Sequence, residues 1–181
     1  MCRPLALAAL LAACAPATPG DPPAPSRDSR VINSGGTVDV YLAPDRTHAE
    51  VTVSAPPARA WEAVRETYTA LGIPAGTSDA QTLTYGNQKL TARRRLGDTP
   101  LSRYLNCGQT VVGAPVAENY RVTLAILSTV HPTPGGGSRV TTRLGASAES
   151  IEGGSSNVVA CGSTGVLEAR IGEGVKSRLG S

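Results

Sequence analysis

Few residues of this chain combine a type and a spacing that could do chemistry. Its two histidines, His48 and His131, lie in no recognisable motif, and no Gly-x-Ser-x-Gly sequence presents a nucleophilic serine. The acidic pair Glu149 and Glu152 is expected at the solvated end of a strand. The segment 161–165 looks like a phosphate loop but lacks the lysine that should follow. We therefore expect no enzyme, no metal and no cofactor.

The clearest chemical signal lies at the amino terminus. One charge, Arg3, precedes an apolar run that ends in Leu11-Ala12-Ala13-Cys14. The run from residue 5 to residue 13 is too short to span a bilayer, and its order is that of an export signal. This segment resembles the lipobox of bacterial lipoproteins, which implies a signal peptide at residues 1–13 and a lipid on the Cys14 thiol. An ordinary signal peptide ending at an Ala-x-Ala site, residues 13–15, is the alternative.

The mature chain is expected to consist of a tether followed by one folded domain. Residues 14–36 are rich in Pro, Ala, Ser and Gly and are expected to form a disordered tether that reaches roughly 25 Å from the lipid. Residues 37–181 are expected to form one domain. Since Ala15 rather than Asp follows the cysteine, the lipoprotein resemblance implies an outer-membrane location facing the periplasm, where a cell has two membranes.

Cysteine usage fits an exported domain. Cys2 lies in the expected signal peptide and Cys14 takes the lipid, which leaves Cys107 and Cys161. An isolated pair in an exported protein is read as a structural disulfide, with two free thiols or one reactive cysteine as the alternatives. Neither cysteine belongs to a C-x-x-C motif, and the two histidines are at unsuitable spacings for a shared metal site.

Periodicity predicts an α+β domain with a curved antiparallel sheet of about six strands. Trp61, Val64, Tyr68 and Leu71 form one face of a helix that begins at Pro56 and Pro57, and Trp61 is expected in the core. The chain has no Phe, so Val, Leu, Ile and Ala must fill the interior. Alternating apolar residues predict six strands, at 38–42, 51–55, 81–85, 89–95, 120–130 and 140–146.

The turns and the last helix complete this prediction. Gly86-Asn87 is expected to join two strands as a tight hairpin, and the run 134–137 to reverse the chain between the two long strands. A C-terminal helix is predicted over 163–179, capped by Ser163 or Thr164. Its apolar stripe is expected to pack on the long strand at 120–130 and on the facing residues of the neighbouring strand.

This order of elements resembles the helix-grip arrangement, in which a curved antiparallel sheet holds a C-terminal helix. The stretch VSAPPARAWEAV at 53–64 is also similar to the strand-to-helix entry of two helix-grip groups. These are the small modules of the outer-membrane assembly lipoprotein BamC and the larger lipid-binding START-type proteins. The length of this domain is nearer to the smaller module.

The charge pattern bears on the partners. A net charge of +3 without dense basic stretches argues against nucleic acid. The cluster Arg93, Arg94 and Arg95 is read as a solvated strand end, or else as a contact for a lipid headgroup or an acidic partner. We expect a non-enzymatic envelope module that binds protein or wall components. The alternatives are a carrier or sensor of an apolar ligand held between sheet and C-terminal helix, and an enzyme with an unrecognised site.

Overall fold

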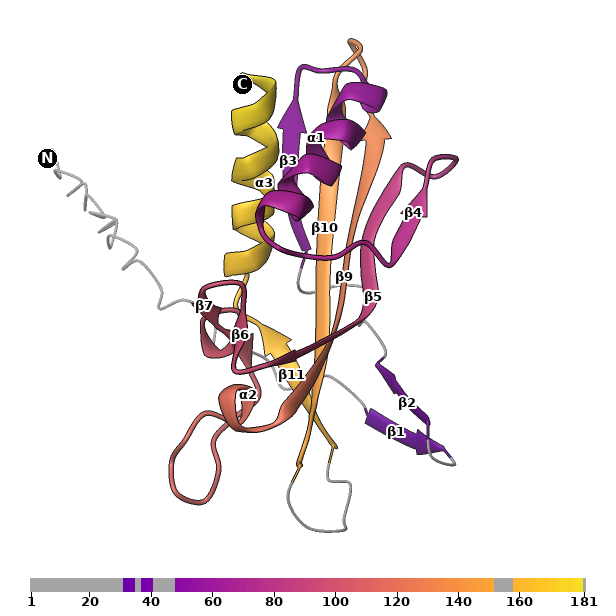
Figure 1. The fold of residues 1–181 in the computed structure, drawn as a ribbon. Helices are drawn as coiled ribbons and strands as arrows, with labels where there is room; N and C mark the ends of the chain where they lie inside the picture. Colours follow the sequence, from indigo (N-terminus) through magenta and orange to yellow (C-terminus); the bar gives the residue numbers. More distant parts are fainter. Residues whose placement is uncertain (1–30, 35–36, 41–47, 152–157, 181) are drawn as a thin grey trace, which may run out of the picture.

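The computed structural model describes residues 31–34, 37–40, 48–151 and 158–180 (Figure 1). The expected signal peptide, Cys14 and most of the expected tether lie outside these residues. The first described elements, β1 (Val31–Ser34) and β2 (Thr37–Val40), pair with each other as an antiparallel hairpin. Regular structure therefore begins before the expected domain boundary at residue 37.

The main sheet is built around two long antiparallel strands, β9 (Arg121–Pro132) and β10 (Ser138–Glu149). β5 (Thr84–Arg93) pairs with the other side of β9. The second edge of β10 is shared, since β3 (His48–Val53) pairs with its first half and β11 (Val158–Ser163) with its second half. Short strands extend this sheet: β4 (Thr77–Asp79), β6 (Arg95–Leu96), β7 (Thr99–Pro100) and β8 (Leu105–Asn106).

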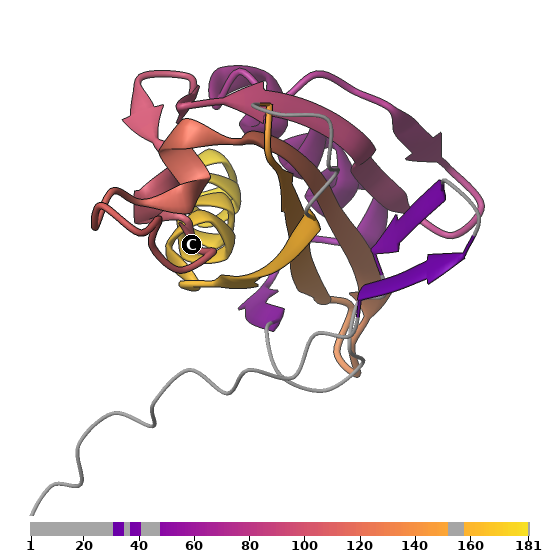
Figure 2. The same ribbon diagram turned by 90° about the horizontal axis from the view of Figure 1, so that it is seen from below.

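Two helices cover one face of the sheet and lie side by side (Figure 1). α1 (Pro57–Ala70) lies over β5 and β9, whereas α3 (Val166–Leu179) lies over β3 and β10. The sheet curves around α3, as the view along the strands shows (Figure 2). A 3-10 turn, η1 (Leu101–Arg103), and a short helix, α2 (Val116–Asn119), lie between β7 and β9.

The expected α+β class is confirmed, with a mostly antiparallel open sheet, a helix after the first strands and a C-terminal helix. α3 packs on β10, as expected, and on β3, whereas α1 rather than α3 covers the long strand at 120–130, which corrects that part of the expectation. α3 also begins at Val166 rather than at Ser163, and Gly165 precedes it. The first helix begins as predicted, with Pro57 in its first turn, where the missing N–H of proline costs nothing.

Alternate residues of the long strands face the helices and form the interior. Val122, Leu124 and Ile126 of β9 are fully buried, as are Tyr68 of α1 and Ile171 of α3. Each fully buried side chain of this size contributes about 1.5–3 kcal/mol. Small aliphatic residues thus fill the core of a domain without Phe, as the composition requires.

A chain of hydroxyl groups runs through this apolar interior. The Tyr68 hydroxyl lies 2.9 Å from Ser128 Oγ, which in turn lies 2.7 Å from Thr142 Oγ1. Burial raises the pKa of the Tyr68 hydroxyl far above its ordinary value, so this group remains protonated. Each hydroxyl has a partner, which offsets its desolvation on burial.

The predicted hairpin at Gly86-Asn87 is wrong. β5 runs without a turn through both residues, with a bulge between Asn87 and Leu90, and the turn lies earlier, between β4 and β5. There the Asp79 carboxylate accepts hydrogen bonds from the backbone N–H groups of Gln81 and Thr82. Gly86 serves close strand packing instead, because a Cβ atom at this position would lie 2.1 Å from the backbone oxygen of Ile126.

Trp61 is only partly buried, which corrects its placement in the core. It packs against the edge of the core cluster, with the Arg65 guanidinium 5.0 Å from the centre of its ring. Its indole nitrogen is buried and has no hydrogen-bond partner among the described residues. Ala60, Val64 and Tyr68 form the fully buried face of α1.

A disulfide joins Cys107 and Cys161, as the sequence predicts. Cys107 follows β8, and Cys161 lies in β11, which pairs with β8. The bond closes a loop with a sequence separation of 54 residues, which by the chain-entropy estimate stabilises the fold by about 4 kcal/mol. It fixes the strand that leads directly into α3.

Candidate functional site

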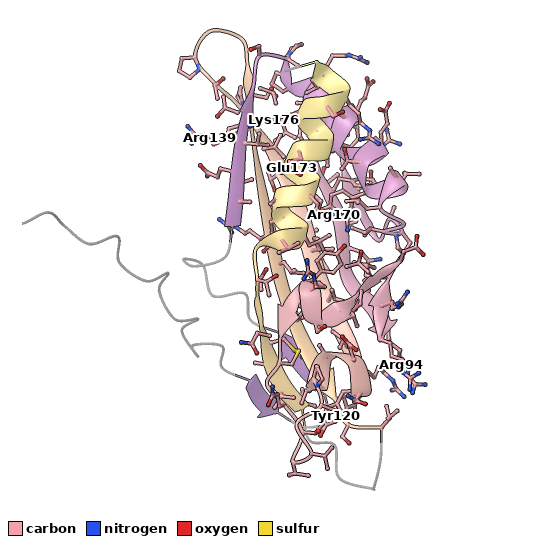
Figure 3. All side chains as sticks on the ribbon, turned by 90° about the vertical axis from the view of Figure 1, so that its left-hand side faces the viewer. Arg94, Tyr120, Arg139, Arg170, Glu173 and Lys176 are labelled. Carbon is pink, nitrogen blue, oxygen red and sulfur yellow. A yellow bond between two sulfur atoms is a disulfide. The ribbon has the colours of Figure 1, made fainter. Side chains whose placement is uncertain are left out.

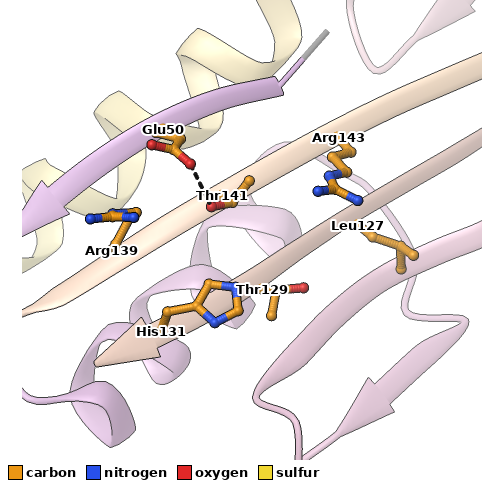
Figure 4. A pocket seen from close by; sticks show the side chains of 7 residues that line it. All are labelled: Glu50, Leu127, Thr129, His131, Arg139, Thr141 and Arg143. Carbon is orange, nitrogen blue, oxygen red and sulfur yellow. Dashed lines mark hydrogen bonds between the residues drawn. The ribbon is translucent and has the colours of Figure 1, made fainter. Parts of the chain in front are cut away.

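The face of the sheet opposite the helices carries an open groove of about 580 Å³, lined by polar and apolar surface (Figure 4). Its lining comes from adjacent strands in register. Thr141 of β10 lies opposite both Glu50 of β3 and Thr129 of β9, and Arg139 lies opposite His131. The complete lining is Glu50, Leu127, Thr129, His131, Arg139, Thr141 and Arg143.

The alternation of strand residues explains this lining. Since successive side chains point to opposite faces, the buried residues Val140 and Thr142 place Arg139, Thr141 and Arg143 on the outer face. Leu127, Thr129 and Thr141 are half-buried and form the floor of the groove. Glu50, His131 and the two arginines are exposed and form its rim.

The groove has a positive electrostatic balance. Arg139 and Arg143 have no ion pair or hydrogen bond among the described residues, whereas Thr141 Oγ1 donates a hydrogen bond to Glu50 at 3.3 Å. Two guanidinium groups, those of Arg139 and Arg143, lie beside the one carboxylate of the lining, that of Glu50. Guanidinium groups bind carboxylates and phosphates through paired N–H donors. On the floor, the Thr141 hydroxyl donates to Glu50 and the Thr129 hydroxyl is hydrogen-bonded to Thr84, so both offer acceptor oxygens to a ligand.

The groove offers charged and hydroxyl side chains and one apolar contact. Its lining holds no cysteine or serine, and within the described part of the chain His131 has no hydrogen-bond partner that would orient it as a base. The described residues also contain no cluster of three or more His, Cys, Asp or Glu that could hold a metal ion. The arrangement offers a shallow cationic surface with one apolar contact at Leu127.

The space under α3 is filled by side chains. Leu167, Ile171 and Val175 of α3 are at most 1% exposed and belong to one core cluster with Val64 and Tyr68. The Glu168 carboxyl group is also buried here, and it accepts a hydrogen bond from Ser163 Oγ at 2.6 Å. Burial raises the pKa of this carboxyl group.

The structure does not bring the predicted site residues into the groove. Cys14 lies outside the described residues, and the disulfide of Cys107 and Cys161 joins segments beside the second half of β10, whereas the groove lies over its first half. Glu149 pairs with Arg121 across the sheet at 3.7 Å, and Glu152 is not among the described residues. The sequence analysis did not identify Arg139 and Arg143 as site residues. The alternation that predicted the buried residues of this strand nevertheless implies that both arginines lie on the outer face.

Comparisons with known proteins assign no family. No protein-family model matches the chain, and no curated protein is significantly similar to it. Among the described residues, no helix has the length and apolar character needed to cross a bilayer.

Proposed function

We propose that this protein is a lipoprotein anchored to the cell envelope through Cys14, and that its domain is a non-enzymatic binding or assembly module. We place it at the outer membrane, facing the periplasm. The observation that supports a binding module is the contrast between the two faces of one sheet. The inner face is filled by α1 and α3, whereas the outer face presents an open groove with two arginines that have no ion-pair partner in the described part of the chain.

The charge of the groove indicates the chemistry of its partner. Arg139 and Arg143 lie four residues apart on one strand, about 13 Å along its axis, on the same face. A ligand with two acidic groups at this separation would engage both. The threonine hydroxyls between them would bind its polar backbone. An extended segment of an envelope protein or a wall polymer with carboxylates or phosphates fits this pattern.

The carrier alternative requires room between sheet and C-terminal helix. Ile171 and Val175 point into that region and are fully buried against the core. An apolar ligand would have to displace them, and drug-sized ligands need pockets of several hundred Å³. This packing favours the binding module over the carrier.

A site-specific crosslinking experiment tests the groove. A photoreactive amino acid in place of Thr141 should yield a defined adduct in intact envelopes, identified by mass spectrometry. The double substitution Arg139→Ala and Arg143→Ala should abolish that adduct, because it removes both guanidinium groups from the rim. The matched control removes two exposed positive charges elsewhere, through Lys89→Ala and Lys176→Ala, and should leave the adduct intact.

Two results would contradict the proposal. An adduct that persists in the arginine double variant would show that the groove is not the binding surface. A lipid or other apolar molecule that co-purifies with the native protein, seen by native mass spectrometry, would favour the carrier instead.

A further inference from the structure

One loop displays two apolar side chains that the fold does not use. Val111 and Val112 are 106% and 85% exposed, the highest values among the large hydrophobic residues of the described chain. They lie in the segment between β8 and α2, which projects at the lower end of the molecule (Figure 1). Neither valine contributes to the core, so folding alone gives no reason for two adjacent apolar residues at this position.

The loop is closed by its own backbone. The Thr110 N–H donates to Ala114 O at 2.8 Å, and the Gly113 N–H donates to Thr110 O at 2.9 Å. An isolated bridge between Gln109 and Pro115 narrows its base, and the Cys107 disulfide holds the segment that precedes it. These bonds hold the two valines at the tip of a tight turn and prevent them from folding back onto the domain.

A group of arginines lies at the same end of the sheet. Arg93, Arg94 and Arg95 are exposed where β5 turns into β6, and Arg93 lies opposite Arg121 of β9. Arg94 has a φ of +62°, a left-handed conformation that glycine or asparagine would adopt at lower cost. Arg121 is paired with Glu149, so the folding cost in this group lies in the backbone of Arg94. The positive charges are therefore present despite the folding cost, which points to a binding role.

The loop and the arginines are brought together by α2. The loop leads directly into this helix, which contacts β5, β9 and η1, so both features flank it. Figure 3 shows Arg94 projecting outward from the lower part of the molecule. β1, the first described element, contacts β11 in the lower part of the molecule as well (Figure 1).

We propose that this end of the domain is a membrane-contact surface, with Val111 and Val112 entering the interfacial region of the bilayer and Arg93, Arg94 and Arg95 binding anionic headgroups. Apolar side chains beside positive charges are the combination that interfacial membrane binding uses. A tether alone would let the domain rotate freely above the membrane. A second contact would orient it, with the outer groove turned to the side. The proposal rests on the proposed lipid anchor for its biological context.

Vesicle sedimentation tests this surface without the anchor. The probe is the chain from residue 14 to residue 181 with Cys14→Ala, mixed with phosphatidylcholine vesicles that contain phosphatidylglycerol or lack it. We expect binding to the anionic vesicles that weakens with salt. The substitutions Val111→Ser and Val112→Ser together should lower the partition coefficient about tenfold. Each arginine replaced by Ala should lower it roughly fivefold.

Matched control variants distinguish binding through this surface from nonspecific adsorption to vesicles. Val166→Ser removes a 40%-exposed valine from the start of α3, and Lys89→Ala with Lys176→Ala removes charge elsewhere; neither should change binding. Unchanged melting temperatures would verify that all variants fold. Absence of binding to anionic vesicles, or equal binding by the loop variant and the parent, would overturn the proposal. A failure of the anchor hypothesis would appear separately, as a mature amino terminus without an acylated Cys14.

Discussion

Replacing Glu168 by glutamine should stabilise the protein at neutral pH. Glu168 lies in the first turn of α3 and is 1% exposed. Ser163 Oγ donates to one carboxylate oxygen at 2.6 Å, while the other, Oε2, is buried without a hydrogen-bond partner among the described residues. Burial raises the pKa of the Glu168 carboxyl group, whereas the Ser163 hydroxyl and the residue's own backbone N–H act to lower it.

The size of the effect follows from two opposing contributions. A buried oxygen without a partner costs about 1–3 kcal/mol, and more when it is charged. The first turn of a helix favours a negative charge by about 0.3–1 kcal/mol. The raised pKa indicates that desolvation outweighs the helix and the hydrogen bond. Glutamine keeps an oxygen for Ser163 and carries no charge, so we expect Glu168→Gln to raise the free energy of unfolding by about 1 kcal/mol at pH 7.

The stabilisation by Glu168→Gln should increase with pH, because the pKa of Glu168 is raised in the folded state. The folded-state pKa of Glu168 lies above the unfolded-state value of about 4.3, so between these values the native protein binds more protons than the unfolded chain. Stability therefore falls as pH rises through this window. Below it the carboxyl group is protonated in both states, and glutamine offers little advantage. Tyr68, the other ionisable group that interacts with Glu168, stays protonated throughout.

Urea unfolding at about pH 3.5 and at pH 7 measures both effects, because the midpoint reports stability when the slope is unchanged. Glu173→Gln is the matched control, since this residue lies on the same helix but is exposed. It should shift the midpoint little at either pH. The reasoning is refuted if Glu168→Gln destabilises the protein at pH 7, or if it stabilises equally at both pH values.

Three further predictions concern the anchor, the disulfide and the core. Cys14→Ala should release the protein from membranes, measured by fractionation, and intact mass should show an acylated Cys14 in the parent; a different amino terminus would refute the anchor. Cys107→Ser should lower stability by up to about 4 kcal/mol, whereas an unchanged melting temperature on reduction would exclude a stabilising role. Ile171→Ala should cost about 2–4 kcal/mol, against little for the partly exposed Val166→Ala, and a cost below about 1 kcal/mol would indicate an unfilled interior.

Much of this fold could be predicted from the sequence, because regular alternation and helical spacing report directly on which side of an element is buried. The two long strands and both helices are present where apolar periodicity placed them, and the isolated cysteine pair is joined. The prediction of a hairpin at Gly86 was wrong because a glycine in a strand pattern has two possible structural roles. It can supply a turn, or it can let two strands approach, and only the contact with Ile126 distinguishes them.

The candidate groove was missed for a different reason. Arg139 and Arg143 were left unassigned, because exposed charges on a strand are common and signal nothing alone. Their significance depends on register, which sets Arg139 opposite His131 and Arg143 opposite Leu127. Register is fixed by strand pairing over the whole sheet and cannot be read from one strand. The burial of Glu168 could not be predicted from the sequence either, since a glutamate in the first turn of a helix is usually exposed to solvent.

The glycines of α3 connect the packing of the helices to the proposed function. In an isolated helix each interior glycine is destabilising by about 1 kcal/mol, so Gly174 should weaken α3. In the folded protein a Cβ atom at Gly174 would lie 2.6 Å from Thr67 Cγ2 of α1, so a larger residue would push the two helices apart. The close contact seals the face that a carrier would need to open. This packing is the reason why we propose the outer groove and the loop end, rather than the inner face, as the binding surfaces among the described residues.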